Sequence, residues 1–279
     1  MTTRHVARHA HRCRTRRCVA AVLVALATVI VAAPARAQIA VDRLELFLRP
    51  TAPDGRSGLL MVRNEGSERS QAVVKVEDWD RATDGTNRFF AAGTQPGSCA
   101  SALRVFPSTL SLAPGESQAI RVDIDSASAG RIRAECWNVV IVQAQQPVKQ
   151  AGGRTLLYTL RTGMKVYVTP DGLTAEGEVT DLQIEAAARG DTGAAPKARV
   201  TFRNTGALHV AAQGRLEIRR EDNSLVAVAA LPAMHALPGA EAVVTVRLPA
   251  CPPGRYTVVA IVDYGGAELA AGELEHEIP

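Results

Sequence analysis

The chain has 279 residues and a formal net charge of +4 at neutral pH. Residues 1–37 hold seven arginines and no acidic residue, so the rest of the chain has 25 basic and 28 acidic side chains, a net charge of about −3. This balance gives no support to nucleic acid as a partner, because such proteins carry a basic patch or stripe. The length after residue 37 suits two domains of ordinary size.

The N-terminal segment, residues 1–37, has the three parts of an export signal. Residues 1–18 contain six arginines and three histidines, residues 19–33 form an apolar run, and residues 34–37 read Pro-Ala-Arg-Ala. A membrane anchor is the alternative, but a spanning helix needs about 20 apolar residues and this run is shorter. We therefore expect a signal peptide over residues 1–37, cleaved before Gln38, and an exported chain that is not embedded in a membrane.

Short apolar runs between Gly, Pro, Asn and Asp turns predict strands along the whole remaining chain. In the first half the clearest are Gly58–Val62, Ala72–Val76, Ala119–Ile124 and Asn138–Val142. In the second half they are Ala198–Phe202, Gly214–Ile218, Val243–Arg247 and Tyr256–Val262. The segment Asp181–Arg189 has some helical character. The spacing of strands and turns favours an all-β fold of two tandem β-sandwiches.

An internal echo supports a duplication. Residues 62–66 read Val-Arg-Asn-Glu-Gly and residues 202–206 read Phe-Arg-Asn-Thr-Gly, and each is followed by a Pro-Gly turn, at Pro114 and at Pro238. The echo divides the chain near residue 170, where Pro170-Asp171-Gly172 forms a turn. We expect one domain over residues 38–169, a second over residues 170–279, and a hinge at this turn.

The last strand expected in the first half, within residues 155–169, alternates in character. With a period of two, one side carries Leu156, Tyr158, Leu160 and Met164, and the other carries Leu157, Thr159, Arg161 and Lys165. Such a strand suits a surface that lends β-structure to another protein. Half-buried strands with this alternation also occur in any sandwich.

Three cysteines, Cys99, Cys136 and Cys251, follow the expected cleavage site. Cys99 and Cys136 fall in the same expected domain, so we expect a disulfide between them in an oxidising compartment. Two buried thiols are the alternative. Cys251 has no evident partner.

The sequence offers little support for catalysis. His209, His235 and His276 have no metal-binding spacing, and no G-x-S-x-G, phosphate loop or C-x-x-C occurs. The segment Asp78–Gly85 faintly resembles a calcium loop, but its ligand spacing is wrong, and a hairpin turn at residues 83–85 accounts for it better. We expect no enzymatic activity, metal, cofactor or small-molecule substrate.

Three motifs, in order, resemble the PapD-like periplasmic chaperones of pilus assembly. Residues 105–122 contain Val-Phe-Pro and then Leu-Ser-Leu-Ala-Pro-Gly-Glu-Ser-Gln-Ala-Ile-Arg-Val. Val41-Asp42-Arg43 looks like the first strand of that family, and Asp263-Tyr264-Gly265-Gly266 matches an element near its end. The likeness covers the chain after residue 37, and it is strongest over residues 105–170.

The resemblance implies two immunoglobulin-like domains arranged as a boomerang and a role as a periplasmic chaperone of fimbrium biogenesis. In that family the last strand of the first domain is donated to an incomplete pilus or fimbrial subunit. Here Leu156, Tyr158 and Leu160 match the donor positions, Met164 continues their face, and Lys165 matches a lysine that holds the subunit's C-terminal carboxylate. Arg43 is a further candidate for a cation that contacts this carboxylate. The expected partners are such subunits, and an outer-membrane usher is left open.

Two departures from the family pattern leave an alternative open. Glu45 stands where the family has a second basic residue beside the carboxylate. Glu135 and Asp263 match the two acids of its interdomain ion-pair network, but the basic member falls at Thr169, which leaves Arg161 or Arg133 to compensate. The alternative is an exported structural or surface-assembly protein with two such domains and no chaperone function. A secreted hydrolase with an accessory sandwich lacks any catalytic cluster.

Overall fold

Strands dominate this protein because apolar side chains recur at every second position between turn residues. The computed structural model describes residues 39–149, 153–186 and 195–278, so the signal peptide expected at residues 1–37 lies outside the described residues. β3 (Ser57–Asn64) illustrates the pattern, since Leu60 and Val62 are buried whereas Leu59 and Met61 are exposed. Alternation of this kind buries one face of a strand and leaves the other to solvent.

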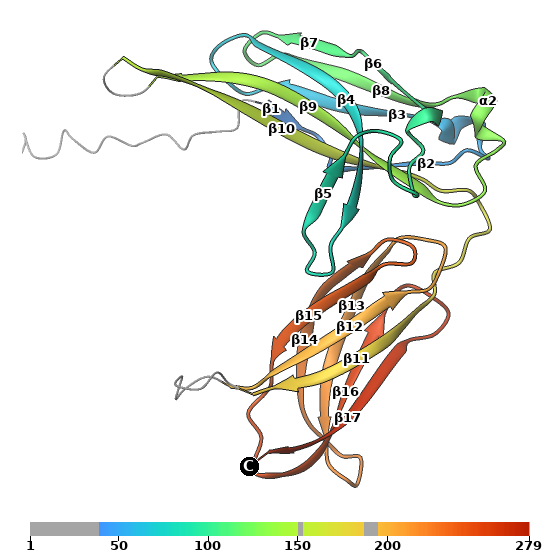
Figure 1. The fold of residues 1–279 in the computed structure, drawn as a ribbon, viewed down its shortest axis with the longest axis vertical. Helices are drawn as coiled ribbons and strands as arrows, with labels where there is room; N and C mark the ends of the chain where they lie inside the picture. Colours follow the sequence, from blue (N-terminus) through green and yellow to red (C-terminus); the bar gives the residue numbers. More distant parts are fainter. Residues whose placement is uncertain (1–38, 150–152, 187–194, 279) are drawn as a thin grey trace, which may run out of the picture. The chain divides into compact units, whose positions relative to one another are not determined.

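Within the described ranges, strands from the first half pair with one another, in two facing sheets (Figure 1). One sheet has the order β1 (Ile39–Val41), β3, β8 (Ser117–Ile124), β6 (Leu103–Phe106). The other has the order β2 (Glu45–Leu48), β10 (Thr155–Val168), β9 (Cys136–Lys149), β4 (Ser70–Arg81), β5 (Asn87–Phe90), and β7 (Thr109–Leu112) also pairs with β4. The connections contain two 3-10 turns and one helical turn, η1 (Pro53–Arg56), η2 (Ala100–Ala102) and α2 (Ser126–Ala129).

Strands from the second half form two further sheets. One has the order β11 (Gly177–Glu185), β12 (Lys197–Asn204), β15 (Glu241–Arg247). The other has the order β14 (Leu225–Ala236), β13 (Val210–Arg219), β16 (Gly254–Asp263), β17 (Ala270–Ile278). The all-β fold with two sandwiches is therefore confirmed, and each of the eight expected strand segments lies in a strand. In the described part of the chain, no helix is both long and apolar enough to span a membrane.

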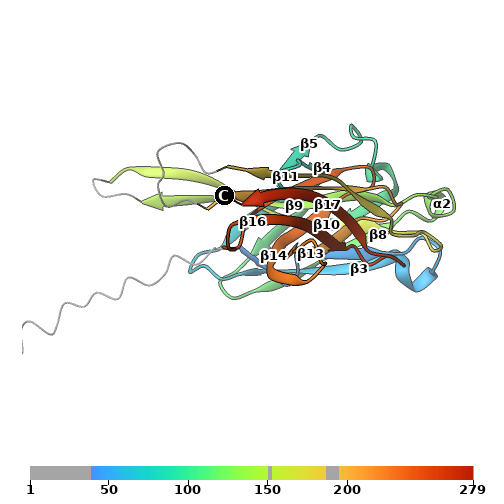
Figure 2. The same ribbon diagram turned by 90° about the horizontal axis from the view of Figure 1, so that it is seen from below.

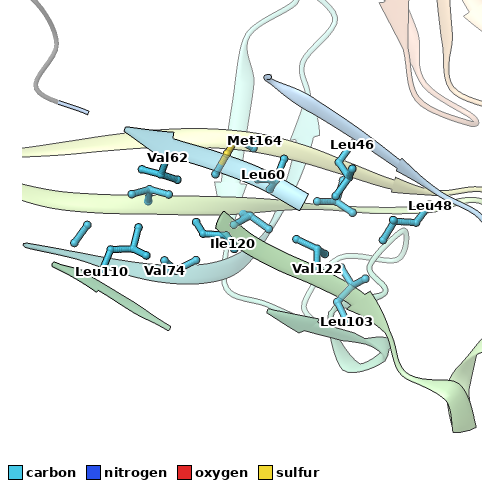
Figure 3. Packing of buried hydrophobic residues seen from close by; sticks show 14 of the residues in the cluster. Leu46, Leu48, Leu60, Val62, Val74, Leu103, Leu110, Ile120, Val122 and Met164 are labelled. Carbon is cyan, nitrogen blue, oxygen red and sulfur yellow. The ribbon is translucent and has the colours of Figure 1, made fainter. Parts of the chain in front are cut away.

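Each sandwich has its own apolar core. Figure 3 shows the first core, where side chains of β2, β3, β4, β8 and β10 meet between the two sheets. The second core is built in the same way around Phe202, Leu216 and Val258, which are fully buried. Two separate cores explain why each half of the chain can bury the apolar face of its own strands.

The helical character expected for Asp181–Arg189 is wrong over the residues that the structure describes. Residues 181–185 belong to β11 and pair with β12 from Asp181↔Thr201 to Glu185↔Lys197. Leu182 and Ile184 pack against the second core. Burial of these alternate apolar side chains outweighs the weak local preference for helix.

Asn64 and Asn204, the centres of the sequence echo, occupy equivalent positions in the two sandwiches. Both are fully buried. The Asn64 side-chain amide donates to the carbonyls of Glu68 and Leu112, and its oxygen accepts the Gly66 amide. Asn204 does the same with Leu208, Ala236 and Gly206. One turn architecture is thus built twice, as expected for a duplicated unit.

β9 and β10 form a long hairpin that runs past the ends of the neighbouring strands (Figure 1 and Figure 2). β10 is paired with β9 along its whole length, from Thr155↔Lys149 to Val168↔Cys136. Beyond β10 the chain turns at Asp171-Gly172, and the Thr51 hydroxyl donates to the Asp171 carboxylate over 2.6 Å. This bond ties the turn to the first sandwich.

Candidate partner-binding site

β10 has a free edge. On one side it pairs with β9 throughout, but on the other side β2 covers only four residues, from Lys165↔Glu45 to Val168↔Leu48. Within the described residues, no strand pairs with residues 155–164 on that second side. Their backbone groups on that side are therefore available to an added strand.

The side chains of β10 change environment along the strand while staying on one face. Met164, Val166 and Val168 are fully buried in the first core, and Leu160 packs at its margin. Leu156 and Tyr158 continue the same face but are 41% and 52% exposed. The apolar face of β10 therefore extends beyond the core that it helps to build. Met164, expected among the partner-binding residues, belongs to this core instead and offers no surface to a partner.

The opposite face of β10 is exposed at Leu157 and engaged within the sandwich at Arg161. Leu157 is 62% exposed, whereas the guanidinium of Arg161 pairs with Glu77 and lies 6.0 Å from the ring centroid of Phe89. Arg161 thus does not replace the missing basic residue beside Glu135.

Lys165 lies where the free edge of β10 ends and β2 begins. Its ammonium nitrogen is 3.9 Å from a carboxylate oxygen of Glu45 and 4.6 Å from the ring centroid of Trp79. Burial lowers the pKa of Lys165, the charge of Arg81 lowers it further, and Glu45 acts in the opposite direction. A cation held this way is partly desolvated, which strengthens its attraction for an incoming anion.

Arg43 and Lys165 line one shallow hollow at the end of the free edge, together with Leu44, Glu45 and Gly163. The Arg43 guanidinium, however, bonds to the adjacent Asp42 over 3.0 Å, and its side chain is 53% exposed. Arg43 is therefore near the edge of β10, and its guanidinium is engaged with the adjacent Asp42.

A second hollow, which we call the Trp79 hollow, is lined by Glu45, Phe47, Trp79, Arg81, Tyr167, His209 and His235, among others. Burial lowers the pKa of His235, and the charges of Arg81 and Lys165 lower it further. Burial also raises the pKa of Tyr167. The hollow therefore brings the carboxylate of Glu45 together with the guanidinium of Arg81, and sequence reasoning missed both Trp79 and Arg81.

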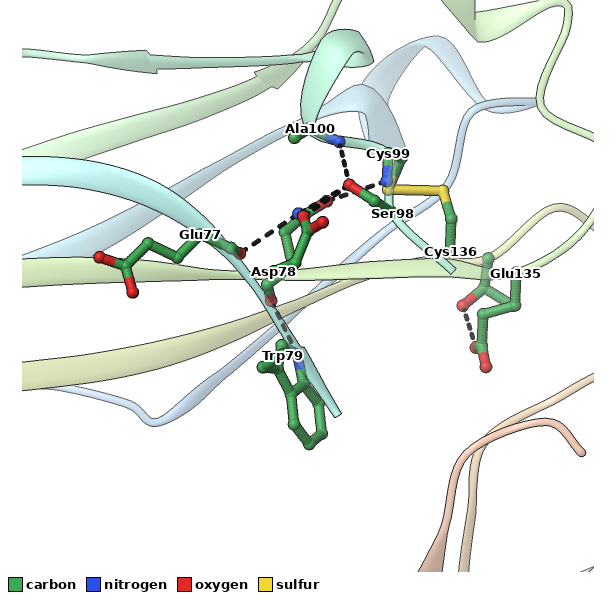
Figure 4. The surroundings of a disulfide bond; sticks show 10 residues. Glu77, Asp78, Trp79, Ser98, Cys99, Ala100, Glu135 and Cys136 are labelled. Atoms are coloured by element: carbon green, nitrogen blue, oxygen red, sulfur yellow. Dashed lines mark hydrogen bonds between the residues drawn. A yellow bond between two sulfur atoms is a disulfide. The ribbon is translucent and has the colours of Figure 1, made fainter. Parts of the chain in front are cut away.

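Trp79, which lines this hollow, belongs to a buried network beside a disulfide (Figure 4). The Trp79 indole donates to the Asn138 carbonyl over 3.2 Å, and the Asn138 amide donates to Asp78 over 2.6 Å. Asp78 also accepts from the Ser98 hydroxyl and from the Thr94 and Gln95 amides. Burial opposes ionisation of Asp78, but these bonds together lower its pKa. Asp78 therefore remains charged and fixes the loop that precedes Cys99.

The structure contains the disulfide between Cys99 and Cys136, with the two Cα atoms 5.5 Å apart. The Cys99 amide donates to the Asn138 side chain over 3.0 Å, which connects the disulfide to the same network. Cys251 is a free thiol, and burial raises its pKa.

Glu135 connects the two sandwiches, whose described residues belong to one compact unit. Its side chain is fully buried and accepts from the Thr169 hydroxyl over 2.8 Å and from the His209 amide. The His209 Nδ1 atom lies 2.8 Å from the same carboxylate, and the imidazole stacks on Tyr167 with 3.9 Å between ring centroids. His209 thus occupies the place beside Glu135 where a basic residue was expected.

Asp263, paired with Glu135 in the sequence expectation, is not part of this junction. It is exposed at the end of β16 and accepts the Gly265 amide within its own turn. Asp-x-Gly turns satisfy their carboxylate locally in this way. The Asp-Tyr-Gly-Gly motif at residues 263–266 therefore forms a turn.

No protein-family model and no curated protein matches the chain. Similar solved structures include a chain of the chaperone–tip adhesin complex of CFA/I fimbriae biogenesis, with a TM-score of 0.48 and 14% identity over 86% of this chain and 98% of that one. The class 5 fimbriae chaperone CfaA has a TM-score of 0.46 and 14% identity, over 86% and 99% of the two chains. The YadV chaperone has a TM-score of 0.46 and 15% identity, over 85% and 100%. Function has to be inferred from the geometry of the site.

Proposed function

We propose that this protein is an exported, non-enzymatic chaperone that captures a pilus-type subunit by lending it the free edge of β10. The observation that carries the proposal is the edge of residues 155–164, with which no strand of the described chain pairs on that side, next to an apolar face that leaves the core at Leu156 and Tyr158. An exposed apolar edge strand is an aggregation hazard unless something covers it. A client with an incomplete sheet would pair with the strand edge and cover the exposed apolar side chains.

The physical basis is β-augmentation. Backbone hydrogen bonds along the edge supply affinity, and alternate side chains fill a groove in the client. Each apolar side chain that becomes fully buried contributes about 1.5–3 kcal/mol before the costs of ordering are subtracted. Leu156 and Tyr158 have the most surface to bury on this face, and Leu160 contributes less because it already packs on the core.

The neighbouring strand gives the expected direction of the client strand. β2 runs parallel to β10 on the side where the free edge lies. A client strand that is also parallel to β10 would end beside Leu44 and Lys165, with its C-terminal carboxylate facing the lysine. An antiparallel strand would bring a positive N-terminus to the same lysine, which like charges disfavour. The cation therefore supports the parallel arrangement.

The competing function is an exported two-sandwich protein that retains the fold without capture. The contact between Lys165 and Glu45 favours it, because that pairing satisfies the lysine internally. Yet the two charged atoms are 3.9 Å apart and the Glu45 side chain is 44% exposed. Such a pair contributes little and yields readily to a better partner.

Substitutions on the two faces of β10 provide the test. Leu156→Asp combined with Tyr158→Asp should abolish co-purification with a co-expressed pilus-type subunit encoded beside the gene, because charges would enter the groove without partners. Leu157→Asp, at a more exposed position on the opposite face, is the matched control and should leave capture intact. Equal capture by the parent, the double variant and the Leu157 control would contradict the donor role of the face that carries Leu156 and Tyr158.

A further inference from the structure

The outward face of β13, in the second sandwich, carries an acid between two arginines. Leu216 and Ile218 point into the second core, so Arg215, Glu217 and Arg219 share the opposite face of the strand. The Arg215 Nε donates to one carboxylate oxygen of Glu217 over 2.6 Å, and the Arg219 Nε donates to the other over 2.9 Å. The Glu217 side chain is only 5% exposed. We call Arg215, Glu217 and Arg219 the β13 triad.

The β13 triad has an excess positive charge. Hydrogen bonds from Arg215 and Arg219 hold the pKa of Glu217 below its usual value, so at neutral pH this carboxylate is charged and offsets one of the two guanidiniums. The arginine side chains remain 50% and 29% exposed. In the described part of the chain, the two terminal nitrogens of Arg215 donate no hydrogen bond. An anion that approaches this face therefore meets a guanidinium with free N–H groups.

The edge strand of the same sheet has the opposite charge. β17 exposes Glu273, Glu275 and Glu277 at alternate positions, and across the described ranges none of the three forms an ion pair. β16 lies between β13 and β17 (Figure 1). Within one row of the sheet, Glu217 pairs with Val259 and Val259 pairs with Glu273. Directly paired residues share a face, so the β13 triad and Glu273 stand outward on either side of Val259.

Between these two charged rows, β16 presents an apolar strip. Val259 and Ile261 are half-buried on this face, and Ile261 pairs with Ala271 of β17. On the far side of β13, Val228 is 49% exposed. An apolar centre with charged margins is the usual anatomy of a protein–protein interface.

We propose that this face of the second sandwich binds the same face of a second copy of the chain. A two-fold axis that runs along β16 exchanges β13 with β17, because both strands lie one strand spacing from β16. Val259 then meets its counterpart at the axis, and the β13 triad of each copy faces Glu273 of the other. The charge match is made twice, as a symmetric contact requires, and the strands of the two facing sheets are nearly aligned.

A second copy is the partner that this face suits because the face carries its own complement. A surface of one charge sign would repel another copy, whereas here the cations and the acids occupy opposite margins of one apolar strip. No residue of β10 takes part in the contact. The inference therefore goes beyond the proposed capture function and does not depend on it.

Analytical ultracentrifugation of the purified protein over a range of concentrations tests the inference. The parent should form a dimer whose dissociation constant rises with added salt. Glu273→Arg and, separately, Arg215→Glu should each raise this constant about tenfold or more, since each change sets like charges opposite one another twice. An equimolar mixture of the two variants should form a heterodimer, because both charge contacts then join opposite signs.

Two controls separate this contact from other modes of association. Glu178→Arg makes the same charge change at an exposed position of β11, in the other sheet, and should leave the dissociation constant unchanged. Leu156→Asp combined with Tyr158→Asp should also leave it unchanged. A dimer that is lost in this β10 variant but survives Glu273→Arg would overturn the inference and assign the association to the free edge of β10.

Two further results would overturn the inference. A parent that stays monomeric would mean that the acids of β17 only protect a sheet edge from pairing. Variants that stay monomeric when mixed would exclude the two-fold contact. Unfolding curves check that Arg215→Glu folds, and Glu273→Arg, at an exposed position of the edge strand, tests the contact by itself.

Discussion

The Nδ1 atom of His209 lies 2.8 Å from a carboxylate oxygen of Glu135, a residue 74 positions earlier in the chain. The Glu135 side chain is fully buried, and its other donors are the Thr169 hydroxyl and the His209 amide. A buried carboxylate is stable only when its oxygens are satisfied. Glu135, Thr169 and His209 thus form a buried polar contact at the junction between the two sandwiches.

Glu135→Ala should destabilise the protein by about 1–3 kcal/mol, because it leaves these donors without an acceptor. Urea unfolding followed by tryptophan fluorescence measures the loss. Glu65→Ala removes an exposed acid and should change stability little. Equal stability of the two variants would contradict the structural role of Glu135.

Asn64→Ala and Asn204→Ala should each destabilise one sandwich by about 2–4 kcal/mol, because each removes two donated bonds and one accepted bond from a buried turn. If residues 38–169 and 170–279 are separate folding units, each variant should shift a different part of the thermal transition. Calorimetry distinguishes the outcomes, and identical traces for both variants would contradict two independent units.

Asp78→Asn should lower stability at neutral pH, and the difference from the parent should vanish in acid. The folded pKa of Asp78 lies below its unfolded value of about 3.9, so its contribution is present above that value and is lost as the pH falls through the folded pKa. Urea unfolding at pH values stepped down from 7 measures the change, because the contribution falls progressively below the unfolded pKa. Asp54→Asn, at an exposed position, is the control. A difference that does not decline as the pH falls would show that charge is not the cause.

Reduction of the disulfide should cost about 4 kcal/mol, as the chain-entropy model gives for a sequence separation of 37 residues. Cys99→Ser combined with Cys136→Ser should show a comparable loss in urea unfolding. Under denaturing, non-reducing conditions, thiol titration of the chain from residue 39 onward should detect Cys251 alone. Two or more further thiols would indicate that the bridge does not form.

The amino-acid sequence was sufficient for the regular parts of this protein. Alternating apolar residues predicted the eight segments that lie in strands, because the two faces of a strand differ at every second residue. The Asn-x-Gly echo likewise predicted a repeated turn, since its hydrogen bonds close within a few residues. The helical character expected for residues 181–185 was wrong because their pairing with β12 outweighs their local preference for helix.

For the candidate site, the sequence by itself determined which side chains share a face of β10, since this depends only on the period of the strand. It did not determine where that face leaves the core, which buries Met164 and exposes Leu156 because the β9–β10 hairpin runs past the ends of the neighbouring strands. Nor did it show that Arg81 and Lys165 meet at Trp79, or that His209 reaches Glu135. These contacts join residues far apart in the chain, so only the pairing and packing of whole sheets decide them.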